Sequence, residues 1–181
     1  MPLPIAHSLT GFAVYWLKPL RFFNKVWQDI FFLLFIANLA DFDFLPGFLI
    51  GDPNRFHHTY THTPAAALLV ALIGAYYFKK KNNESYFSYF TLLFLVYSSH
   101  IFLDYLTEDT KTPLGVMLCW PFNSNYYISP FIIFDNITRS NNSFTFFQSL
   151  FNEHNLKAII KEFMITGALV ALVKVVRVER K

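Results

Sequence analysis

The segment Tyr86–Leu106 reads YFSYFTLLFLVYSSHIFLDYL, and it decides the fold that we expect. Its length and its Leu and Phe content favour a helix, although runs of Phe and Tyr are also compatible with a strand. About 20 apolar residues are enough to cross a bilayer, so this segment is long enough to span a membrane. His100 and Asp104 lie near its end, four residues apart, and on a helix they share one face.

The composition of the 181-residue chain is strongly apolar: 54% of the residues are hydrophobic and only 15% are charged. Soluble proteins average about 25% charged residues, so the deficit favours a membrane protein over a soluble helical domain with an apolar face. The net charge of +3 is too small and too scattered to predict nucleic-acid binding. One cysteine, Cys119, excludes an intramolecular disulfide, and we expect it to be packed. The N-terminus lacks a basic region, so we expect no cleaved signal peptide.

Further apolar segments complete the prediction of an all-α, up-and-down helical bundle with several membrane-embedded helices. They are Ile5–Leu17, Ile30–Ala40, Pro64–Phe78 and Ile159–Val176. The third has a clear start, because Thr63 can cap a helix whose first position is Pro64. The cations of Lys79–Lys81 suit its C-terminal end. We expect two or more membrane spans, some short or tilted, since Pro64–Phe78 gives only about 22 Å of helix.

The segments between these helices are predicted as loops of one domain, residues 1–181. We expect a turn at Leu45–Gly47, because it contains Pro and Gly. A Pro- and Gly-rich loop, Pro113–Pro130, should lie near the site, and residues 136–155 should form a loop with a short helix. Residues 126–181 then comprise loop, the C-terminal apolar helix and a basic tail. The cations of that tail are Lys174, Arg177, Arg180 and Lys181.

Short connections favour helices that run up and down, and this arrangement gathers the polar residues at one end of the bundle. The residues that it brings there are His7, Asp41, Asp43, His57, His58, His62, His100 and Asp104. Lys18, Arg21 and Lys25 fall at the opposite end. Under the positive-inside rule, that basic end faces the cytoplasm and the polar end faces outward. Other cations lie on the polar side, namely Arg55, Lys111 and Arg139.

Imidazoles and carboxylates in apolar surroundings need compensation, because burying them alone costs several kcal/mol. A metal ion is the usual compensation where His and Asp gather. Each motif alone has a simpler explanation: a hydrogen-bonded pair for His100 and Asp104, a cap or turn for the aspartates, a core position for His7. Their convergence at one bundle end favours a metal site. His154 lies in a polar segment and is expected to be solvated.

The motifs also form a series when they are read in chain order. They are Ala6-His7-x-x-x-Gly11, Leu39-Ala-Asp41-Phe-Asp43, His57-x-x-x-Thr61-His62, Ser99-His100-x-x-x-Asp104-x-Leu-Thr107 and the stretch from Pro113-Leu-Gly115 to Trp120-Pro121-Phe122. This series resembles the YdjM-like family of bacterial membrane-bound metal-dependent hydrolases, over about the first 125 residues of the chain. The resemblance implies an inner-membrane location and hydrolase activity, and it leaves the substrate undefined.

The chain departs from the family pattern in its third motif. The family usually has Arg-Gly after the first histidine and Ser after the second, where this chain has His58-Thr59 and Thr63. The ligand-type residues themselves are kept. The ordered His and Asp series is also similar, more faintly, to the zinc-dependent phospholipase C and P1 nuclease group. Those enzymes are all-helical and use several zinc ions on phosphodiesters.

The residues and the resemblance together predict a membrane-bound, multi-pass, metal-dependent hydrolase. We expect it to act on a phosphoester or another ester of a small-molecule or lipid substrate, through a metal-activated water. One or two divalent ions, Zn with Mn or Mg as alternatives, would be bound by His7, Asp41, His62, His100 and Asp104. Asp43 and His57 are the acid–base candidates. Trp120 and Phe122 are expected to pack over the mouth of the site or to lie at the membrane interface.

The alternative is a non-catalytic membrane protein with a structural metal site, or one that handles ions or protons. A hydrolase keeps an open coordination position, whereas a structural site is closed. Clustering at one bundle end favours the enzyme, because a conduction path would spread ionisable residues through the membrane depth.

Overall fold

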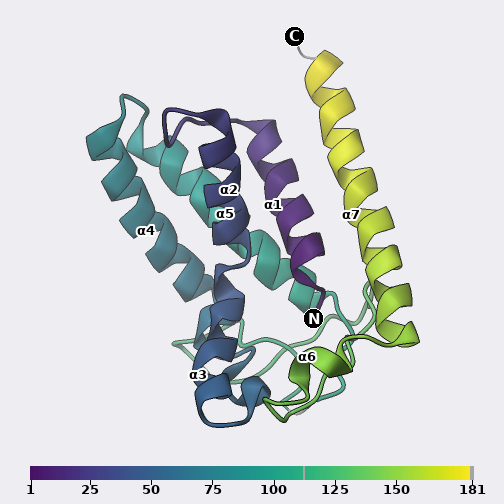
Figure 1. Ribbon diagram of the computed structural model, residues 1–181. Helices are drawn as coiled ribbons and strands as arrows, with labels where there is room; N and C mark the ends of the chain where they lie inside the picture. Colours follow the sequence, from purple (N-terminus) through teal and green to yellow (C-terminus); the bar gives the residue numbers. More distant parts are fainter. Residues whose placement is uncertain (112, 180–181) are drawn as a thin grey trace.

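The computed structural model describes residues 1–111 and 113–179, and within them the chain is helical with no extended strand. Four helices run alongside one another, and a fifth long helix packs against the first (Figure 1). The bundle helices are α1 (Pro4–Leu17), α2 (Val26–Ala37), α4 (Pro64–Lys81) and α5 (Tyr86–Tyr105), and the added helix is α7 (Glu153–Glu179). The predicted all-α, up-and-down bundle is therefore confirmed.

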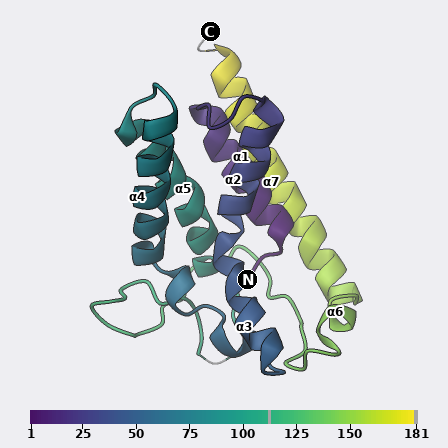
Figure 2. The same cartoon turned by 60° about the vertical axis from the view of Figure 1, so that its left-hand side comes forward.

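The short elements gather at one end of the bundle, where the N-terminus also lies (Figures 1 and 2). They are the 3-10 helices η1 (Leu39–Asp43), η2 (Pro53–Phe56) and η3 (Tyr60–His62), and the short helices α3 (Phe44–Leu49) and α6 (Phe146–Ser149). The α1–α2 and α4–α5 connections lie at the opposite end. This division places the irregular backbone, with its spare polar groups, where the predicted ligands converge.

The helix boundaries differ from the prediction mainly around α2 and α3. The second helix begins at Val26 and ends at Ala37, and the chain then tightens into η1. Leu45–Gly47, predicted as a turn, lies inside α3. Pro46 is tolerated there because the first N–H groups of a helix need no intrahelical acceptor. A Cβ atom on Gly47 would come within 2.6 Å of the Asp52 carbonyl oxygen, so glycine serves close packing.

The C-terminal helix is longer than predicted, because it begins at Glu153 rather than Ile159. The short helix predicted between residues 136 and 155 is α6. Two cations of the predicted basic tail, Arg180 and Lys181, lie outside the described residues.

Small side chains let the bundle helices approach one another closely. Ala67, Ala71 and Ala75, spaced four residues apart on α4, are completely buried, and α4 packs against α5. On α1, a Cβ atom at Gly11 would lie 2.6 Å from the Cβ atom of Ala37 on α2. Stripes of small residues are typical of helix packing in membranes, where close backbone approach replaces the hydrophobic effect. The start of α4 is capped as predicted, because the Thr63 hydroxyl accepts from the Ala66 N–H at 3.1 Å.

One described helix, Tyr86–Tyr105, is by itself long and apolar enough to cross a membrane. Two bent pairs reach that length jointly: Val26–Ala37 with Leu39–Leu49, and Pro53–His62 with Pro64–Lys81. Each bend falls at the end of the bundle that carries the predicted ligands.

Candidate metal centre

The fold brings every predicted ligand to one end of the bundle. His7 comes from α1, Asp41 and Asp43 from η1, His57 and His58 from the chain after η2, His62 from η3, and His100 and Asp104 from α5. All are buried except Asp41, whose side chain is 12% exposed. Residues 7 and 104 meet because α1 and α5 pack together. The predicted convergence is confirmed.

Four side chains form the centre of this cluster: Asp41, His62, His100 and Asp104. The two imidazole Nε2 atoms lie 3.1 Å apart. Each of them lies 3.2 Å from Asp104 Oδ2, and Asp41 Oδ1 lies 3.6 Å from His62 Nε2 and 3.5 Å from His100 Nε2. Bonds of about 2.0–2.2 Å in a tetrahedral zinc site separate the ligand atoms by roughly 3.3–3.6 Å. These spacings therefore fit one small divalent ion.

Hydrogen bonds on the far side of each ring decide which imidazole atoms face the centre. The Nδ1 atom of His100 lies 2.7 Å from the carbonyl oxygen of Ala37, which can only accept, so Nδ1 carries the proton. The Nδ1 atom of His62 lies 3.0 Å from Asp43 Oδ2, which places its proton there as well. In the neutral rings both Nε2 atoms then present lone pairs to the centre. This orientation, with the second nitrogen held by a carbonyl or carboxylate, is the one that metal-binding histidines adopt.

The centre therefore gathers acceptors without donors. Within the described residues, both carboxylate oxygens of Asp41 and of Asp104 are buried and have no hydrogen-bond partner. Two imidazole lone pairs and two carboxylates in close contact repel one another, and burial removes the water that would screen them. Either a cation or additional protons on the imidazoles must balance them. The donor set of two nitrogens and two carboxylates suits Zn²⁺ or Mn²⁺.

His7 flanks the centre on the α1 side. Its ring stacks on that of His100 with 3.7 Å between centroids, and its Nε2 lies 3.7 Å from Asp104 Oδ1. Neither ring nitrogen of His7 has a hydrogen-bond partner among the described residues. Asp104 thus lies between the centre and a further unpartnered imidazole, as a carboxylate between two ions would.

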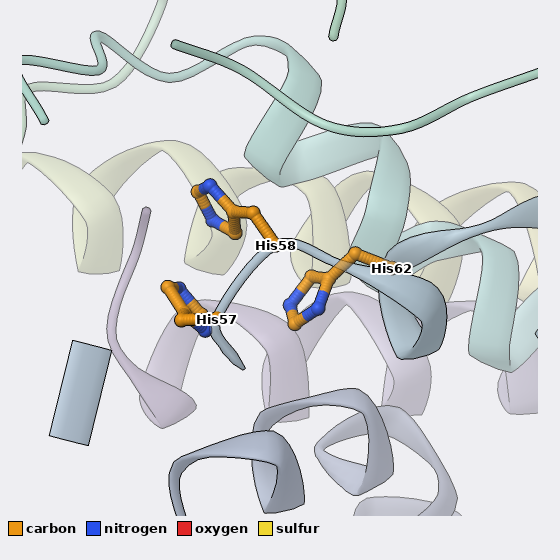
Figure 3. Close-up of side chains that lie close together, drawn as sticks. All are labelled: His57, His58 and His62. Carbon is orange, nitrogen blue, oxygen red and sulfur yellow. The ribbon is translucent and has the colours of Figure 1, made fainter. Parts of the chain in front are cut away.

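His57 and His58 lie next to His62, and the three rings gather close together (Figure 3). Asp43 holds two of these rings: its Oδ1 lies 3.0 Å from His57 Nδ1, while its Oδ2 binds His62. The Nε2 atom of His57 has no partner within the described part of the chain. His58 adopts a left-handed backbone with φ of 63°, which directs its Nε2 to 3.9 Å from Asp104 Oδ2. Together with His62 of the centre, His57 and His58 thus form a group of three imidazoles, with one nitrogen of each within 4.8 Å of the others.

Two residues at the site were not among the predicted site residues. Asp109 Oδ2 lies 3.4 Å from His58 Nδ1 and accepts from the Gly115 N–H at 2.9 Å. Burial favours the neutral acid, but these hydrogen bonds outweigh it and lower the pKa of Asp109 to about 2. Arg139 comes from the loop before α6, and its Nε donates to Asn54 Oδ1 at 2.6 Å. Partial burial, with the nearby Arg139 charge, lowers the pKa of the Lys111 amine.

The remaining sequence expectations have mixed outcomes. His154 is exposed, as predicted, and hydrogen bonds to the Asn136 carbonyl at 2.9 Å. Cys119 is exposed rather than packed, because its carbonyl closes a tight turn to the N–H groups of Phe122 and Asn123. Phe122 is 95% exposed, so the prediction that it packs over the mouth of the site is wrong, and its alternative place at the membrane interface stays a prediction. Trp120 contacts Tyr60 at the edge of the site, with 5.4 Å between ring centroids.

Comparison with known proteins gives one match. A family model described as "YdjM inner membrane protein" matches residues 1–180. No curated protein and no solved structure matches the chain. The family match agrees with the resemblance that the motifs carried through Phe122, and it extends that resemblance over the C-terminal helix.

Proposed function

This chain belongs to the YdjM inner membrane protein family, and we propose that it is a membrane-bound, metal-dependent hydrolase. The observation that carries the proposal is the central group of Asp41, His62, His100 and Asp104. Its nitrogen and oxygen atoms face one another at 3.1–3.6 Å, and among the described residues its four carboxylate oxygens have no hydrogen-bond partner. These four residues would hold the first ion, and His7 with Asp104 would hold a second. Because zinc can expand from four to five ligands, the first ion would still have a position for water, as a hydrolase requires.

A divalent ion bound there supplies a water of lowered pKa and polarises the ester that is attacked. The side chains of the protein do the rest. Asp43 orients His57 and His62 through their Nδ1 atoms and stabilises either ring when it is protonated. His57 has a free Nε2 and lines a polar cavity, so it is placed to take a proton from the attacking water and to return it to the leaving group.

We also propose that the metal centre lies at the outer face of the inner membrane. Lys18, Arg21 and Lys25 lie at the opposite end of the bundle, together with Lys79–Lys81, and the positive-inside rule places such an end in the cytoplasm. The substrate would then be an ester at the outer surface of the bilayer.

Metal analysis of the purified full-length protein tests the site. We expect the wild type to retain one or two equivalents of a divalent metal after dialysis, and the His100→Ala and Asp104→Ala variants to lose most of it. His154→Ala is the matched control, because this histidine lies near the same end but is exposed. Helical circular dichroism should be unchanged in all variants. A wild type without metal after supplementation would contradict the proposal and would mean that protons balance the centre.

Turnover separates the hydrolase from its rival. The metal-loaded protein should release product from a panel of phosphate and carboxylate esters, and chelation should abolish the release. Retention of metal without turnover on any of these esters would instead support a structural site.

A further inference from the structure

Two cavities of opposite character adjoin the metal centre. The first has a volume of about 400 Å³ and is polar, and its walls include Arg55, His57, His58, Asp109, Lys111 and Arg139. The second has a volume of about 220 Å³ and is almost entirely apolar, with Leu3, Phe44, Phe48, Ile137, Phe147 and Leu150 in its walls. Each cavity also reaches a predicted site residue, because His57 lines the first and Asp41 lines the second.

Arg139 lines both cavities and therefore marks their junction. Its guanidinium lies 5.4 Å from the centre of the Phe44 ring, and the same ring stacks on His57, with 4.2 Å between ring centroids. Arg139 and Phe44 thus lie where the polar and the apolar cavity adjoin, next to the imidazole that we propose as the base.

Within the described residues Arg139 makes no direct ion pair, because its Nε donates to the neutral Asn54. The nearest acids that share its cavities are Asp109 in the polar one and Asp41 in the apolar one, and neither contacts the guanidinium as an ion pair. Lys111 lies beside it and donates to the Arg139 carbonyl at 2.6 Å. A partly desolvated guanidinium without a carboxylate is costly, and planar recognition of phosphate is the common use of such a residue. With Arg55, three cations against the two carboxylates of Asp52 and Asp109 line a cavity large enough for a head group, so its formal charge is positive.

We infer that the two cavities bind one amphiphilic molecule, with a phosphate-ester head group in the polar cavity and an alkyl chain in the apolar one. The phosphate would lie at Arg139, between Asp41 on one side and His57 on the other. This inference rests on the proposed function, because it names the substrate class of the same centre. The proposed substrate is a phosphoester that carries an alkyl chain, as a lipid does, rather than a water-soluble phosphoester.

A third, apolar groove beside Asp43 is a poorer place for the chain. Its walls include Tyr60 and Leu69, which are 60% and 58% exposed, so it faces outward along the bundle. Arg139 does not line it. A chain in that groove would leave the head group without the cationic cavity, and the groove therefore provides a control.

Equilibrium binding tests the inference without relying on turnover. The full-length protein, in micelles of a neutral detergent, is titrated with dodecyl phosphate, inorganic phosphate and dodecanol. We expect dodecyl phosphate to bind at least about tenfold more tightly than either of the others, since it alone fills both cavities. Arg139→Gln should lower the affinity for both dodecyl phosphate and inorganic phosphate by roughly tenfold or more, because it removes a charge-assisted hydrogen bond to the phosphate.

Narrowing the apolar cavity should separate the chain from the head group. Leu150→Trp should lower the affinity for dodecyl phosphate by about tenfold, which corresponds to excluding roughly two methylene groups from the apolar cavity. The affinity for inorganic phosphate should stay unchanged. Phe147→Ser is a second variant in the wall of the apolar cavity, and it should also lower the affinity for dodecyl phosphate alone. Because the Phe147 side chain is 64% exposed, this variant should fold even if Leu150→Trp does not. Leu69→Trp in the groove beside Asp43 should change neither affinity.

Three results would overturn the inference. Equal affinities for dodecyl phosphate and inorganic phosphate would mean that the site takes free phosphate only. Dodecanol binding as tightly as dodecyl phosphate would exclude a head-group site, and an effect of Leu69→Trp in place of Leu150→Trp would move the chain elsewhere. Failure of the proposed function looks different: dodecyl phosphate binds as expected, yet no ester is turned over with metal present. If soluble esters are turned over as well as esters with an alkyl chain, the proposed hydrolase activity stands and the inference of a lipid-type substrate is contradicted.

Discussion

Asp43 is the residue on which the geometry of two histidines depends. Its two oxygens lie 3.0 Å from the Nδ1 atoms of His57 and His62, and the Thr61 hydroxyl donates to the same carboxylate at 3.0 Å. An asparagine of the same shape has one acceptor oxygen and one N–H₂ donor, so it can serve only one of the two rings. The other ring would lose its orientation.

We therefore expect Asp43→Asn to weaken metal binding by about 10–100-fold while the fold is retained, as is usual for residues that orient metal ligands. Competition with a chromophoric chelator measures the affinity. Asp52→Asn is the matched control, because Asp52 lies at the same end but its carboxylate accepts, within the described part of the chain, only from the Asn54 N–H at 3.2 Å. Equal metal affinities for wild type and Asp43→Asn would show that Asp43 does not act on the centre.

The convergence of the candidate ligands could be predicted from the sequence because each is a polar residue at or near the end of an apolar segment. His100 and Asp104 are the clearest case, since helical spacing puts them on one face. Asp109 and Arg139 carry no such signal. They come from loops, and their positions depend on contacts far along the chain, such as the hydrogen bond between Arg139 and Asn54. The sequence shows that both side chains are charged, but it does not show that they lie at the site.

At the scale of helices, the contact between α1 and α2 sets the positions of two histidines of the candidate metal centre. Gly11 on α1 lies against Ala37 on α2, and the Ala37 carbonyl holds the Nδ1 atom of His100 on α5. Because His7 is one turn before Gly11, the same contact also sets its distance from the centre. The spacing of these helices and the position of two histidines are thus linked.

Gly11→Ala should push α1 and α2 apart, because the new Cβ atom would lie 2.6 Å from that of Ala37. We expect a loss of about 1–3 kcal/mol of unfolding free energy from overpacking, together with weaker metal binding. Gly167→Ala is the control: among the described residues nothing lies within 4 Å of its added Cβ, so it should stabilise α7 by about 0.5–1 kcal/mol. Thermal unfolding in detergent compares them. A neutral Gly11→Ala would contradict the close contact.

The helices themselves could be predicted from hydrophobic length and caps, as at Thr63 and Pro64. The region after α2 could not. Pro46 and Gly47 are typical of turns, yet they lie in α3, where the glycine is required by the backbone of Asp52 and Pro53. Such a contact between two nearby turns leaves no periodic pattern in the sequence.

At the scale of the whole molecule, the two ends of the bundle differ in chemistry. One end carries buried histidines and aspartates under loops, and the other carries the lysines of the last turn of α4, Lys79–Lys81. The single cysteine, Cys119, is exposed on a loop between α5 and α6 and so reports on the first end.

A membrane-impermeant maleimide should therefore label Cys119 in intact spheroplasts, if the metal centre faces outward as proposed. In the control, Cys119→Ser carries Asn83→Cys in the exposed α4–α5 connection, and labelling should require permeabilisation. Labelling is read by a mass shift on a gel. The reverse pattern would place the metal centre at the cytoplasmic face.

If the unpartnered carboxylates of Asp41 and Asp104 hold a metal ion as proposed, that ion also determines how much of this protein a cell can keep. A folded state that binds metal gains stability with every rise in free metal, whereas the unfolded chain, with its ligands scattered over residues 7 to 104, gains little. Proteases remove chains that spend more time unfolded. The amount of this protein would then follow the zinc supply even when its synthesis is constant, so that shortage of the ion clears the protein from the membrane instead of leaving an inactive form behind.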